Sequence, residues 1–383
     1  LPRSTSELIG HPLVLKKLRE LNNSLRFLVF KPGNRIKNFL ENEGWELLSP
    51  SSYLCRKLED KIEFYDLSLQ HKVCMPESEV LVWEQSKQDV LHDKLGDPFV
   101  LQTRMGHAGS STWIVRKHTP FTEIPDEIKV RVSRFIEART YTVNGYLSLH
   151  GKVAISPLFQ QLMHVPQWNG FEMGTVGITP VTNLPSTALE NLKELLLQVA
   201  KLLHEQEYWG FFGLDLLYDD KTWYLVECNP RFTASISLQC LIDLATNRVP
   251  LLKLHAEKTA LDDDRFDFLG DASSSIPPLK GVRGLEVFGH VVLRNSKPSS
   301  WKTPMTLKSG IYERAEGSWR LRDRSIDARE LREGELLLIL AHRPGTMIDP
   351  GSDFGAIQYR GSALDEAGNI DDRFFDFYER IIM

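Results

Sequence analysis

The chain has 383 residues, more than one hydrophobic core usually supports, so we expect two or three domains or lobes. Hydrophobic residues make up 42% of the chain and charged residues 25%, and no apolar run reaches the ~18–20 residues of a membrane helix, so the sequence predicts a soluble protein without a membrane partner. The net charge of −5 argues against a nucleic-acid partner, and the start lacks an apolar signal-peptide core, so the cytoplasm is the expected compartment.

The first part of the chain predicts a small α/β domain. Residues 25–30 form a continuous apolar run, which indicates a buried strand. A turn, a short amphipathic helix and a second strand near 45–48 follow, and this order favours a parallel sheet. Residues 58–72 have a helical pattern, and extended structure follows Pro76.

The middle of the chain predicts mainly strands, followed by one long helix. A strand, a polar Gly-rich loop and a second strand occupy 98–115. Further extended stretches are expected at 129–136, 140–149 and 152–158, the last two forming a hairpin. The clearest helix spans 185–210, with Ser186 as its N-cap and Gly210 at its end.

The last part of the chain predicts a hairpin and then a mostly β lobe. The hairpin spans 211–229. The stretch 262–278 is acidic and then rich in Ser and Pro, which indicates a boundary or a mobile loop. Several short strands separated by Gly and Pro turns make up the remainder.

Three oxygen-bearing side chains in the hairpin could share one face. Glu227 and Asn229 point the same way because residues two apart on a strand do so. Asp215, on the first strand, joins them if the turn at 219–221 has three residues, whereas a two-residue turn puts it on the opposite face. We predict the three-residue turn, which creates an oxygen site suited to Mg²⁺. The alternative is that the two acids are solvated charges at strand ends.

The loop "GHAGSST" at 106–112 is rich in small and hydroxyl residues. Backbone N–H groups in such a loop can bind phosphates, because no side chain blocks their approach. An ordinary β-turn is the alternative. The order of the segments along the chain favours a phosphate loop. The loop comes first, and "VRVSRFIE", a helix and the hairpin with the two acids and the amide follow it.

The stretch "GLDLLYDDKTWYLVECNPRFTAS" closely resembles the metal-binding hairpin of the ATP-grasp superfamily. The resemblance covers roughly residues 25–260, and the C-terminal lobe resembles the terminal domain of biotin-carboxylase-type members. It implies an ATP-grasp fold, of α/β and α+β class, with an N-terminal parallel α/β domain, a two-lobed ATP clamp and a mostly β C-terminal lobe. The expected parts are an N-terminal domain at 1–92, a small lobe or lid at 93–150, a large lobe at 151–270 and the C-terminal lobe at 271–383.

The resemblance also implies the ligands, ATP and Mg²⁺, and the residues that would bind them. Asp215, Glu227 and Asn229 would hold the metal, and Arg231 and then Arg294 are the catalytic candidates. The alternative for Arg294 is a surface charge. The chain departs from the family at Gln102, where relatives usually have a lysine, and at Thr140, where they usually have a ribose-binding acid. The nucleotide-binding residues implied are Lys61, Gln102, Gly106, His107, Gly109, Ser110, Ser111, Arg134, Phe135, Ile136 and Glu137.

Members of this superfamily mostly phosphorylate a carboxylate and let a nucleophile displace the phosphate. The resemblance therefore implies a ligase that joins a small-molecule carboxylate to an amine, and it admits a homodimer, because many relatives dimerise. A carboxyphosphate-forming enzyme and a non-catalytic nucleotide-binding module are the alternatives. Substitution of Glu227 by Ala is expected to abolish ATP turnover and to leave the fold intact, since the residue lies at a strand end. The stretch 160–174 is expected to be a packed surface loop beside the acceptor pocket, and the alternative is that Gln160, His164 and Trp168 shape that pocket.

Overall fold

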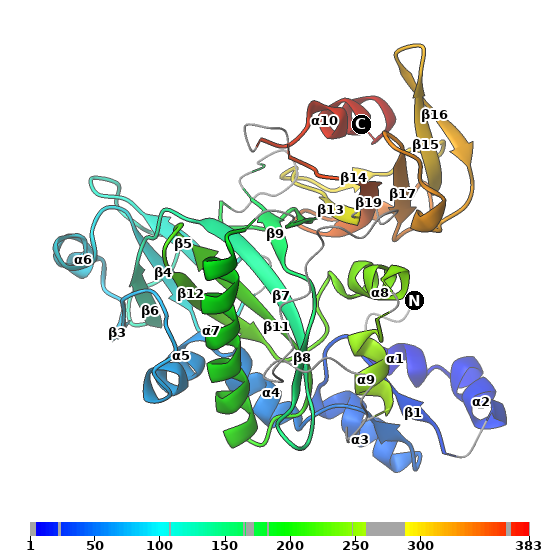
Figure 1. Cartoon of the computed structure of the whole chain (residues 1–383). Coiled ribbons are helices and arrows are strands. Elements are labelled where there is room, and N and C mark those ends of the chain that lie inside the picture. The colour runs from blue at the N-terminus through cyan, green and yellow to red at the C-terminus, as the bar shows by residue number, and fades with distance from the viewer. Residues whose placement is uncertain are drawn as a thin grey trace.

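The structure is a computed structural model, described here for residues 5–21, 24–106, 109–163, 165, 172–181, 184–246, 248–257, 288–364 and 369–382. A small N-terminal unit, a four-stranded sheet and one large sheet make up most of the molecule (Figure 1). The α-helices are α1 (Thr5–Ile9), α2 (Pro12–Leu21), α3 (Asn34–Asn42), α4 (Ser52–Glu59), α5 (Lys61–Gln70), α6 (Gln88–Leu95), α7 (Ser186–Glu205), α8 (Ile236–Ala245), α9 (Leu251–Glu257) and α10 (Asp372–Phe377). Short 3₁₀ or π turns lie at Gln85–Lys87, Ala328–Glu330 and Tyr378–Ile382.

The strands fall into a first group up to the long helix α7 and a second group after it. The first group is β1 (Arg26–Phe27), β2 (Glu46–Leu47), β3 (Ser78–Val82), β4 (Phe99–Thr103), β5 (Thr112–Val115), β6 (Lys129–Arg134), β7 (Arg139–Leu147), β8 (Val153–Ile155), β9 (Phe159–Leu162) and β10 (Gly177–Pro180). The second group is β11 (Gly210–Tyr218), β12 (Trp223–Asn229), β13 (Phe288–Arg294), β14 (Trp301–Lys302), β15 (Gly310–Ala315), β16 (Ser318–Asp323), β17 (Leu336–Leu340), β18 (Met347–Ile348) and β19 (Asp353–Arg360).

The N-terminal unit has the predicted parallel β-α-β order, with α3 connecting β1 to β2. The predicted strand at 25–30 is too long, because β2 offers only two residues for pairing and β1 ends at Phe27. The chain then leaves the sheet, and Phe30 is 54% exposed. This exit brings the segment between β1 and α3 to the large sheet, where it contributes to the candidate site.

The four-stranded sheet has the order β3-β6-β4-β5 and is antiparallel throughout. It contains the predicted strand-loop-strand of 98–115, and Trp83 and Phe99 are buried beneath it. The predicted helix at 58–72 is two helices, α4 and α5. They are separated at Asp60, whose carboxylate accepts hydrogen bonds from the backbone N–H groups of Ile62 (3.0 Å) and Glu63 (3.1 Å) and so caps α5.

The large sheet has the order β12-β11-β7-β9-β10-β13-β19-β17-β15-β16, with β8 paired to β7. The long helix α7 covers one face of its β12-β11-β7 end (Figure 1), and its apolar side chains, among them Leu192, Leu196 and Leu203, are buried there. The helix ends at Glu205, before the predicted end at Gly210, which instead begins β11 with a φ of 107°. Pro185 rather than Ser186 occupies the N-cap position, and it makes no side-chain capping hydrogen bond in the described part of the chain.

The β11–β12 hairpin reaches the predicted arrangement of acids by another turn. Tyr218 pairs with Trp223, so the turn spans four residues, 219–222, and the predicted three-residue turn is wrong. A β-bulge that leaves Val226 as the extra residue then shifts the register, and Asp215 lies directly opposite Glu227. Asp219 stabilises the turn, because its carboxylate accepts hydrogen bonds from the backbone N–H groups at 221 (3.0 Å) and 222 (2.7 Å).

The C-terminal part is mostly β, as predicted, and continues the large sheet from β13 onward, with α10 packed on it. The predicted boundary loop at 262–278 lies outside the described residues. The predicted domain limits stay predictions, but two sheets cross them: β3 precedes the limit at 92 and joins the four-stranded sheet, while β7 precedes the limit at 150 and joins the large sheet.

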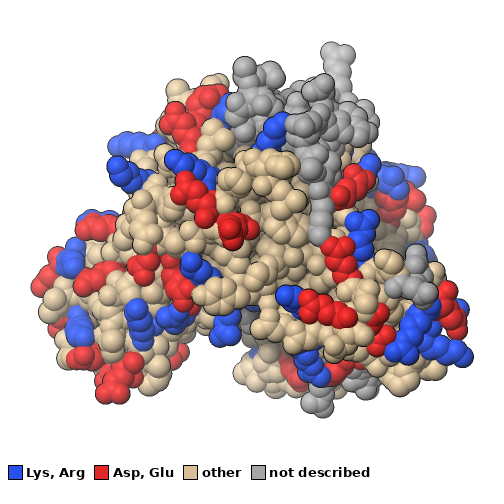
Figure 2. Space-filling view, turned by 90° about the horizontal axis from the view of Figure 1, so that it is seen from below, with Lys and Arg blue, Asp and Glu red and all other residues tan. Residues whose placement is uncertain are grey.

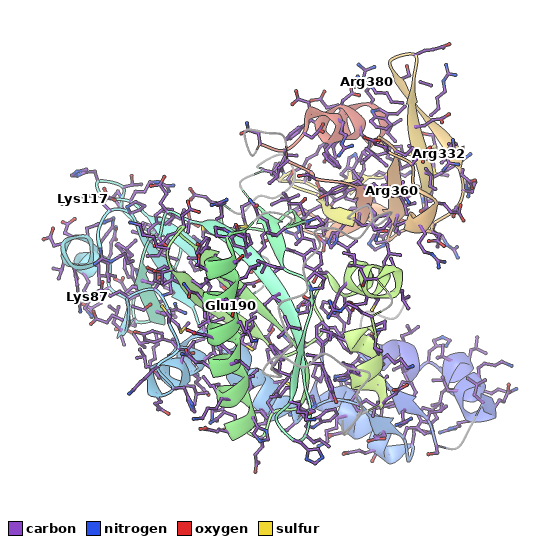
Figure 3. All side chains as sticks on the ribbon, viewed as in Figure 1. Lys87, Lys117, Glu190, Arg332, Arg360 and Arg380 are labelled. Atoms are coloured by element: carbon purple, nitrogen blue, oxygen red, sulfur yellow. The ribbon has the colours of Figure 1, made fainter. Side chains whose placement is uncertain are left out.

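The described surface mixes charges of both signs. Figure 2 shows Lys and Arg side chains interspersed with Asp and Glu over one face, without one continuous basic patch. In Figure 3 Lys87 and Lys117 lie at the outer edge of the four-stranded sheet, and Glu190 lies on the outer side of α7. Among the helices of the described part, none is long and apolar enough to cross a membrane.

Candidate active site

Two carboxylates face each other across the β11–β12 hairpin. Asp215 and Glu227 are cross-strand partners, and Glu227 Oε2 lies 2.7 Å from the buried ammonium Nζ of Lys61. Asn229 Nδ2 donates to Asp215 Oδ2 at 3.2 Å. The structure therefore brings together the three residues predicted as metal ligands and places the predicted ATP lysine beside them.

A further residue, which the sequence did not indicate, lies at the same place. Gln161 Nε2 donates to Asp215 Oδ1 at 2.7 Å. The residue belongs to β9, so the expectation of a surface loop from residue 160 onward is wrong for its first residues. Only the sheet order, which puts β9 beside β7, brings Gln161 to the acid pair.

The two carboxylates titrate differently. Burial, reinforced by the neighbouring Glu227, raises the pKa of Asp215 to about 8. Burial acts to raise the pKa of Glu227, but the ammonium of Lys61, together with Asp215 and Arg231, holds that pKa below its usual value. At neutral pH, and without a cation, the pair therefore has one ionised and one largely protonated carboxyl group.

This donor set fits a hard divalent cation. A cation between the two carboxylates would offset both the burial and the repulsion by Glu227 that keep Asp215 protonated, and Mg²⁺ prefers oxygen ligands of this kind. Two carboxylates and one amide make up the set. Among the described residues no group of three or more His, Cys, Asp or Glu could hold a metal ion.

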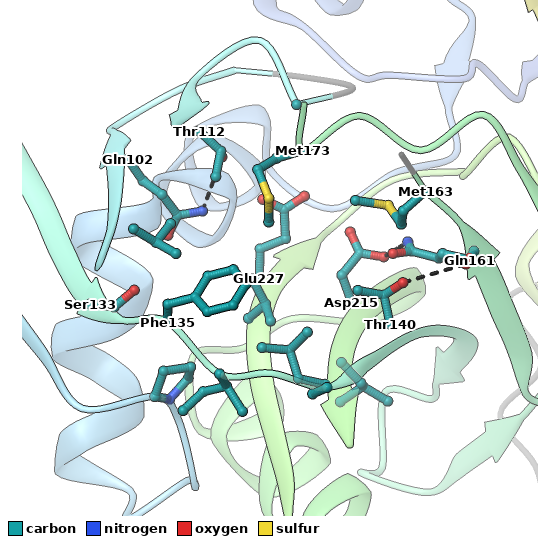
Figure 4. Close-up of a pocket in the computed structure, with 18 of the residues that line it drawn as sticks. Gln102, Thr112, Ser133, Phe135, Thr140, Gln161, Met163, Met173, Asp215 and Glu227 are labelled. Atoms are coloured by element: carbon teal, nitrogen blue, oxygen red, sulfur yellow. Dashed lines mark hydrogen bonds between the residues drawn. The ribbon is translucent and has the colours of Figure 1, made fainter. Parts of the chain in front are cut away.

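A first pocket lies between the four-stranded sheet and the acid pair (Figure 4). Val100, Phe135, Ile136, Met163 and Met173 give it an apolar part, and Asp215 and Glu227 close one side. Figure 4 shows both methionine side chains and Phe135 directed into it. The arrangement suits a flat apolar ring at one end and charged groups at the other.

Five of the eleven residues predicted to bind the nucleotide lie at this first pocket, and Lys61 is not among its described lining residues. Gln102, Gly109, Arg134, Phe135 and Ile136 are among its described lining residues. Glu137 is exposed and is not among them, whereas Ala138 and Thr140 are. The other predicted residues of the loop are not among the described lining residues (Gly106, Ser110 and Ser111), and His107 lies outside the described part of the chain.

Two polar side chains hold the wall of the first pocket. Gln102 Nε2 donates to Thr112 Oγ1 at 3.2 Å and so links β4 to β5. Arg131, which the sequence did not single out, is buried and donates to the carbonyl oxygen of Val226 at 3.2 Å. Burial lowers its pKa to about 10, so it keeps its positive charge at neutral pH. It is a cation directly behind the bulge that aligns the acid pair.

A second pocket, of about 410 Å³, lies on the other side of the acid pair. It shares four lining residues with the first pocket: Gln161, Thr175, Asp215 and Glu227. Three cationic side chains also line it, and they come from distant parts of the chain: Lys31, Arg231 and Arg294. The two pockets thus meet at Asp215 and Glu227, and the second is large enough for a small organic molecule.

The predicted catalytic residue Arg231 is fixed by several contacts. Its Nε donates to Glu59 Oε1 at 3.0 Å, its Nη2 to Asn229 Oδ1 at 2.9 Å and its Nη1 to the carbonyl oxygen of Phe232 at 3.2 Å. The ring of Phe30 lies 5.5 Å from its guanidinium carbon. The guanidinium group is therefore rigidly placed beside the acid-amide set.

Arg294 is not a surface charge. Its side chain is 10% exposed, lines the second pocket and donates from Nε to Asp353 Oδ1 at 2.7 Å. The β13–β19 pairing shifts register between Leu293 and Arg294, and such a bulge re-aims a side chain. The structure thus places the second catalytic candidate at the same pocket as the first.

His290, in this pocket, makes the free energy of unfolding of the protein depend on pH. Burial lowers its pKa to about 4, from the ordinary value of 6.5. Between pH 4 and pH 6.5 the His290 imidazole binds a proton in the unfolded chain but not in the folded chain. The stability that the neutral imidazole contributes is therefore complete above pH 6.5 and is lost as the pH falls toward 4. We expect wild-type protein to lose roughly 3 kcal/mol more unfolding free energy between pH 7 and pH 4 than a His290→Gln variant. Urea unfolding at both pH values measures this, and equal losses would contradict it.

The fold matches known ATP-binding enzymes. The sequence model of the ATP-grasp domain matches residues 58–235. No curated protein matches the sequence of this chain. The biotin carboxylase domain of 2-oxoglutarate carboxylase from Hydrogenobacter thermophilus, solved with MgADP, ADP and bicarbonate, is similar with a TM-score of 0.62 and 11% identity, over 94% of this chain and 76% of that one.

Two further solved structures are similar over almost the whole chain. Biotin carboxylase from Campylobacter jejuni, solved as a β-γ-ATP complex, has a TM-score of 0.62 and 12% identity, over 100% of this chain and 80% of that one. N5-carboxyaminoimidazole ribonucleotide synthetase from Thermus thermophilus has a TM-score of 0.57 and 14% identity, over 97% of this chain and 86% of that one. At such identities the likeness concerns the fold. Together with the match of the ATP-grasp domain model to residues 58–235, it shows that the chain has the ATP-grasp fold.

Proposed function

We propose that this chain is an ATP- and Mg²⁺-dependent ligase that activates a carboxylate as an acyl phosphate and joins it to an amine. The observation that carries the proposal is the meeting of two pockets at Asp215 and Glu227. A phosphoryl group has to pass between a nucleotide and an acceptor, and a shared pair of carboxylates lies where that transfer would occur. Solved structures of similar fold, among them complexes with MgADP and with ATP, support the assignment of the first pocket to the nucleotide.

In this proposal the first pocket binds ATP. The adenine lies among Phe135, Ile136 and the two methionines, and the backbone of residues 134–136 meets its edge. Lys61 contacts the phosphates, and Gln102 donates a hydrogen bond without adding charge. Gly109 allows the loop between β4 and β5 to approach the phosphates closely.

Asp215, Glu227 and Asn229 would hold Mg²⁺, and the raised pKa of Asp215 is the feature of this chain that fits a cation there. When bound, the metal supplies positive charge to the phosphate oxygens. Lys61 and Arg231 add the charge of the protein itself, since both lie within hydrogen-bond reach of this set. Positioned positive charge is the main means by which proteins accelerate phosphoryl transfer.

The second pocket would hold the acyl phosphate when the amine attacks. The attack produces a tetrahedral oxyanion, which Arg231 is placed to stabilise because its guanidinium group lines this pocket and is rigidly held. Arg294 is the second candidate, from the opposite wall.

The proposal is tested by ADP release from MgATP in the presence of carboxylates and amines, singly and in pairs. We expect release that requires both a carboxylate and an amine, together with a condensed product detected by mass. Release with a carboxylate and hydroxylamine, giving a hydroxamate, would independently report the acyl phosphate. Nucleotide binding without turnover on any pair would overturn the proposal in favour of a non-catalytic nucleotide-binding module.

A carboxyphosphate-forming enzyme is the second candidate, because the solved structures with this fold include biotin carboxylases and a carboxyaminoimidazole ribonucleotide synthetase. The same assay separates the two. ADP release that depends on bicarbonate, and that no other carboxylate supports, would favour this second function.

Replacing Gly109 tests the loop. Its φ is 85°, and a Cβ there would lie 2.7 Å from the Cα of Gly174 and from the carbonyl carbon of Met173. We expect Gly109→Ala to raise the KM for ATP several-fold, because the loop has to move away from the pocket wall. Gly44→Ala is the matched control: its φ is 73° but nothing lies within 4 Å of the added Cβ. An unchanged KM in Gly109→Ala, or an equal increase in both variants, would contradict the role of this close approach.

A further inference from the structure

One buried carboxylate binds two of the cations that line the second pocket. Glu59, at the end of α4, places Oε1 3.0 Å from Arg231 Nε and Oε2 2.6 Å from Lys31 Nζ. Glu59 is buried and is not among the described lining residues, whereas Lys31 and Arg231 are. The carboxylate therefore lies behind the two cations, which face the pocket.

This cluster has an excess positive charge. One carboxylate is shared by an ammonium and a guanidinium group, so the three residues carry a net charge of +1 at neutral pH. On the other wall Arg294 is matched by Asp353, and near the acid pair Lys61 is matched by Glu227. Of these three groups of ion pairs, the one formed by Glu59, Lys31 and Arg231 has one more cation than carboxylates.

Donors for a ligand are also available there. A guanidinium group has five N–H groups, and within the described chain three of those of Arg231 are bonded, which leaves two. The ammonium of Lys31 has three N–H groups, and it belongs to a side chain that is 55% exposed. A singly charged carboxylate would supply the missing negative charge and accept from both groups.

The segment that carries Lys31 is held at the pocket. The neighbouring Phe30 packs its ring against the guanidinium group of Arg231 and also lines the pocket. Ile178 and Val292 add apolar surface on the large sheet. The anion site is therefore bordered by apolar walls, which suits a carboxylate that carries a short apolar group.

We propose that Lys31, which the N-terminal unit contributes, is a substrate-binding residue that binds the carboxylate group of the acid substrate together with Arg231, while Glu59 positions both cations. This inference rests on the proposed function for the identity of the pocket as the acid site. It assigns substrate selection in part to the segment between β1 and α3, outside the matched domain at 58–235.

The test measures binding without turnover. The melting temperature of the full chain is recorded with rising concentrations of acetate, propanoate, butanoate or benzoate, and with propylammonium or sodium chloride at equal ionic strength. A ligand that binds the folded state raises the melting temperature by mass action. We expect stabilisation by at least one carboxylate and none by propylammonium, and a Lys31→Gln variant to bind that carboxylate about tenfold more weakly.

Lys37→Gln is the matched control, because Lys37 is an exposed lysine of the same N-terminal unit whose ammonium pairs with Glu41 on its own helix. It should bind the carboxylate as wild type does, and both variants should bind MgADP equally well. Equal carboxylate affinity in Lys31→Gln and wild type, no stabilisation of wild type by any carboxylate, or stabilisation by propylammonium would overturn the inference. Carboxylate binding that depends on Lys31 without ADP release on any acid–amine pair would leave the anion site standing and remove the proposed function.

Discussion

A Glu227→Gln variant is expected to lose ATP turnover by about 10²–10³-fold while it still folds. The amide keeps the size of the side chain and an oxygen that can accept from Lys61, but it removes the negative charge from the proposed metal site. Asp215 then loses its charged neighbour, and one carboxylate has to hold the cation. Steady-state ADP release at saturating MgATP measures the effect, and thermal unfolding shows whether the variant folds.

Glu227→Gln tests the metal site more specifically than Glu227→Ala does. The sequence suggests that Glu227→Ala leaves the fold intact because the residue lies at a strand end. The structure contradicts this reason: Glu227 is only 26% exposed and is the ion-pair partner of the buried Lys61. Alanine would leave that ammonium unpaired and is expected to lower the unfolding free energy by about 1–3 kcal/mol.

Glu43→Gln is the matched control for the Glu227 variant. Glu43 is a partly buried acid that pairs with Arg19, away from both pockets. Its replacement should leave ADP release unchanged. Turnover that is unchanged in Glu227→Gln would remove the metal-site assignment, and turnover lost equally in both variants would point to a general effect on folding.

The sequence allowed the acid pair to be predicted but not the way the chain aligns it. Strand alternation correctly puts Glu227 and Asn229 on one face, since that depends only on local geometry. The position of Asp215 depends on the register, and the four-residue turn and the bulge at Val226 compensate for one another. Neither the four-residue turn nor the bulge has a strong local sequence signal. The prediction therefore put Asp215 on the correct face although it assumed the wrong turn length.

Other residues of the site could not be found from local patterns. Gln161, Arg131 and Lys31 come from three separate segments, and each reaches the site through sheet order or through a long-range ion pair. Nothing in the neighbouring sequence distinguishes Gln161 from Gln160, since one sheet position separates them. For Arg294, the positive charge of the side chain suggested an exposed position as the alternative. The side chain is instead buried, and its pairing with Asp353 accounts for this.

An Arg231→Lys variant is expected to lower kcat by about 10²-fold and to leave the KM for ATP within a factor of about two. The charge is kept, but the geometry is lost. Arg231 uses separate N–H groups to contact Glu59, Asn229 and the backbone at Phe232, and its flat face packs against Phe30. A lysine ammonium is a single point donor and cannot make these contacts together. Pre-steady-state measurement of ADP formation checks whether the chemical step has slowed.

The control for Arg231→Lys is Arg139→Lys on the neighbouring strand. Arg139 pairs with Asp220 at the turn of the same hairpin, and both side chains are exposed, so the pair contributes little. Its replacement should change neither kcat nor KM. If Arg231→Lys instead raised the KM for ATP and kept kcat, Arg231 would bind the nucleotide rather than stabilise the reacting acceptor, and the assignment of the two pockets would have to be exchanged. The expected result, a lower kcat that external guanidinium ions partly restore, would support a role for the guanidinium contacts of Arg231 at the second pocket.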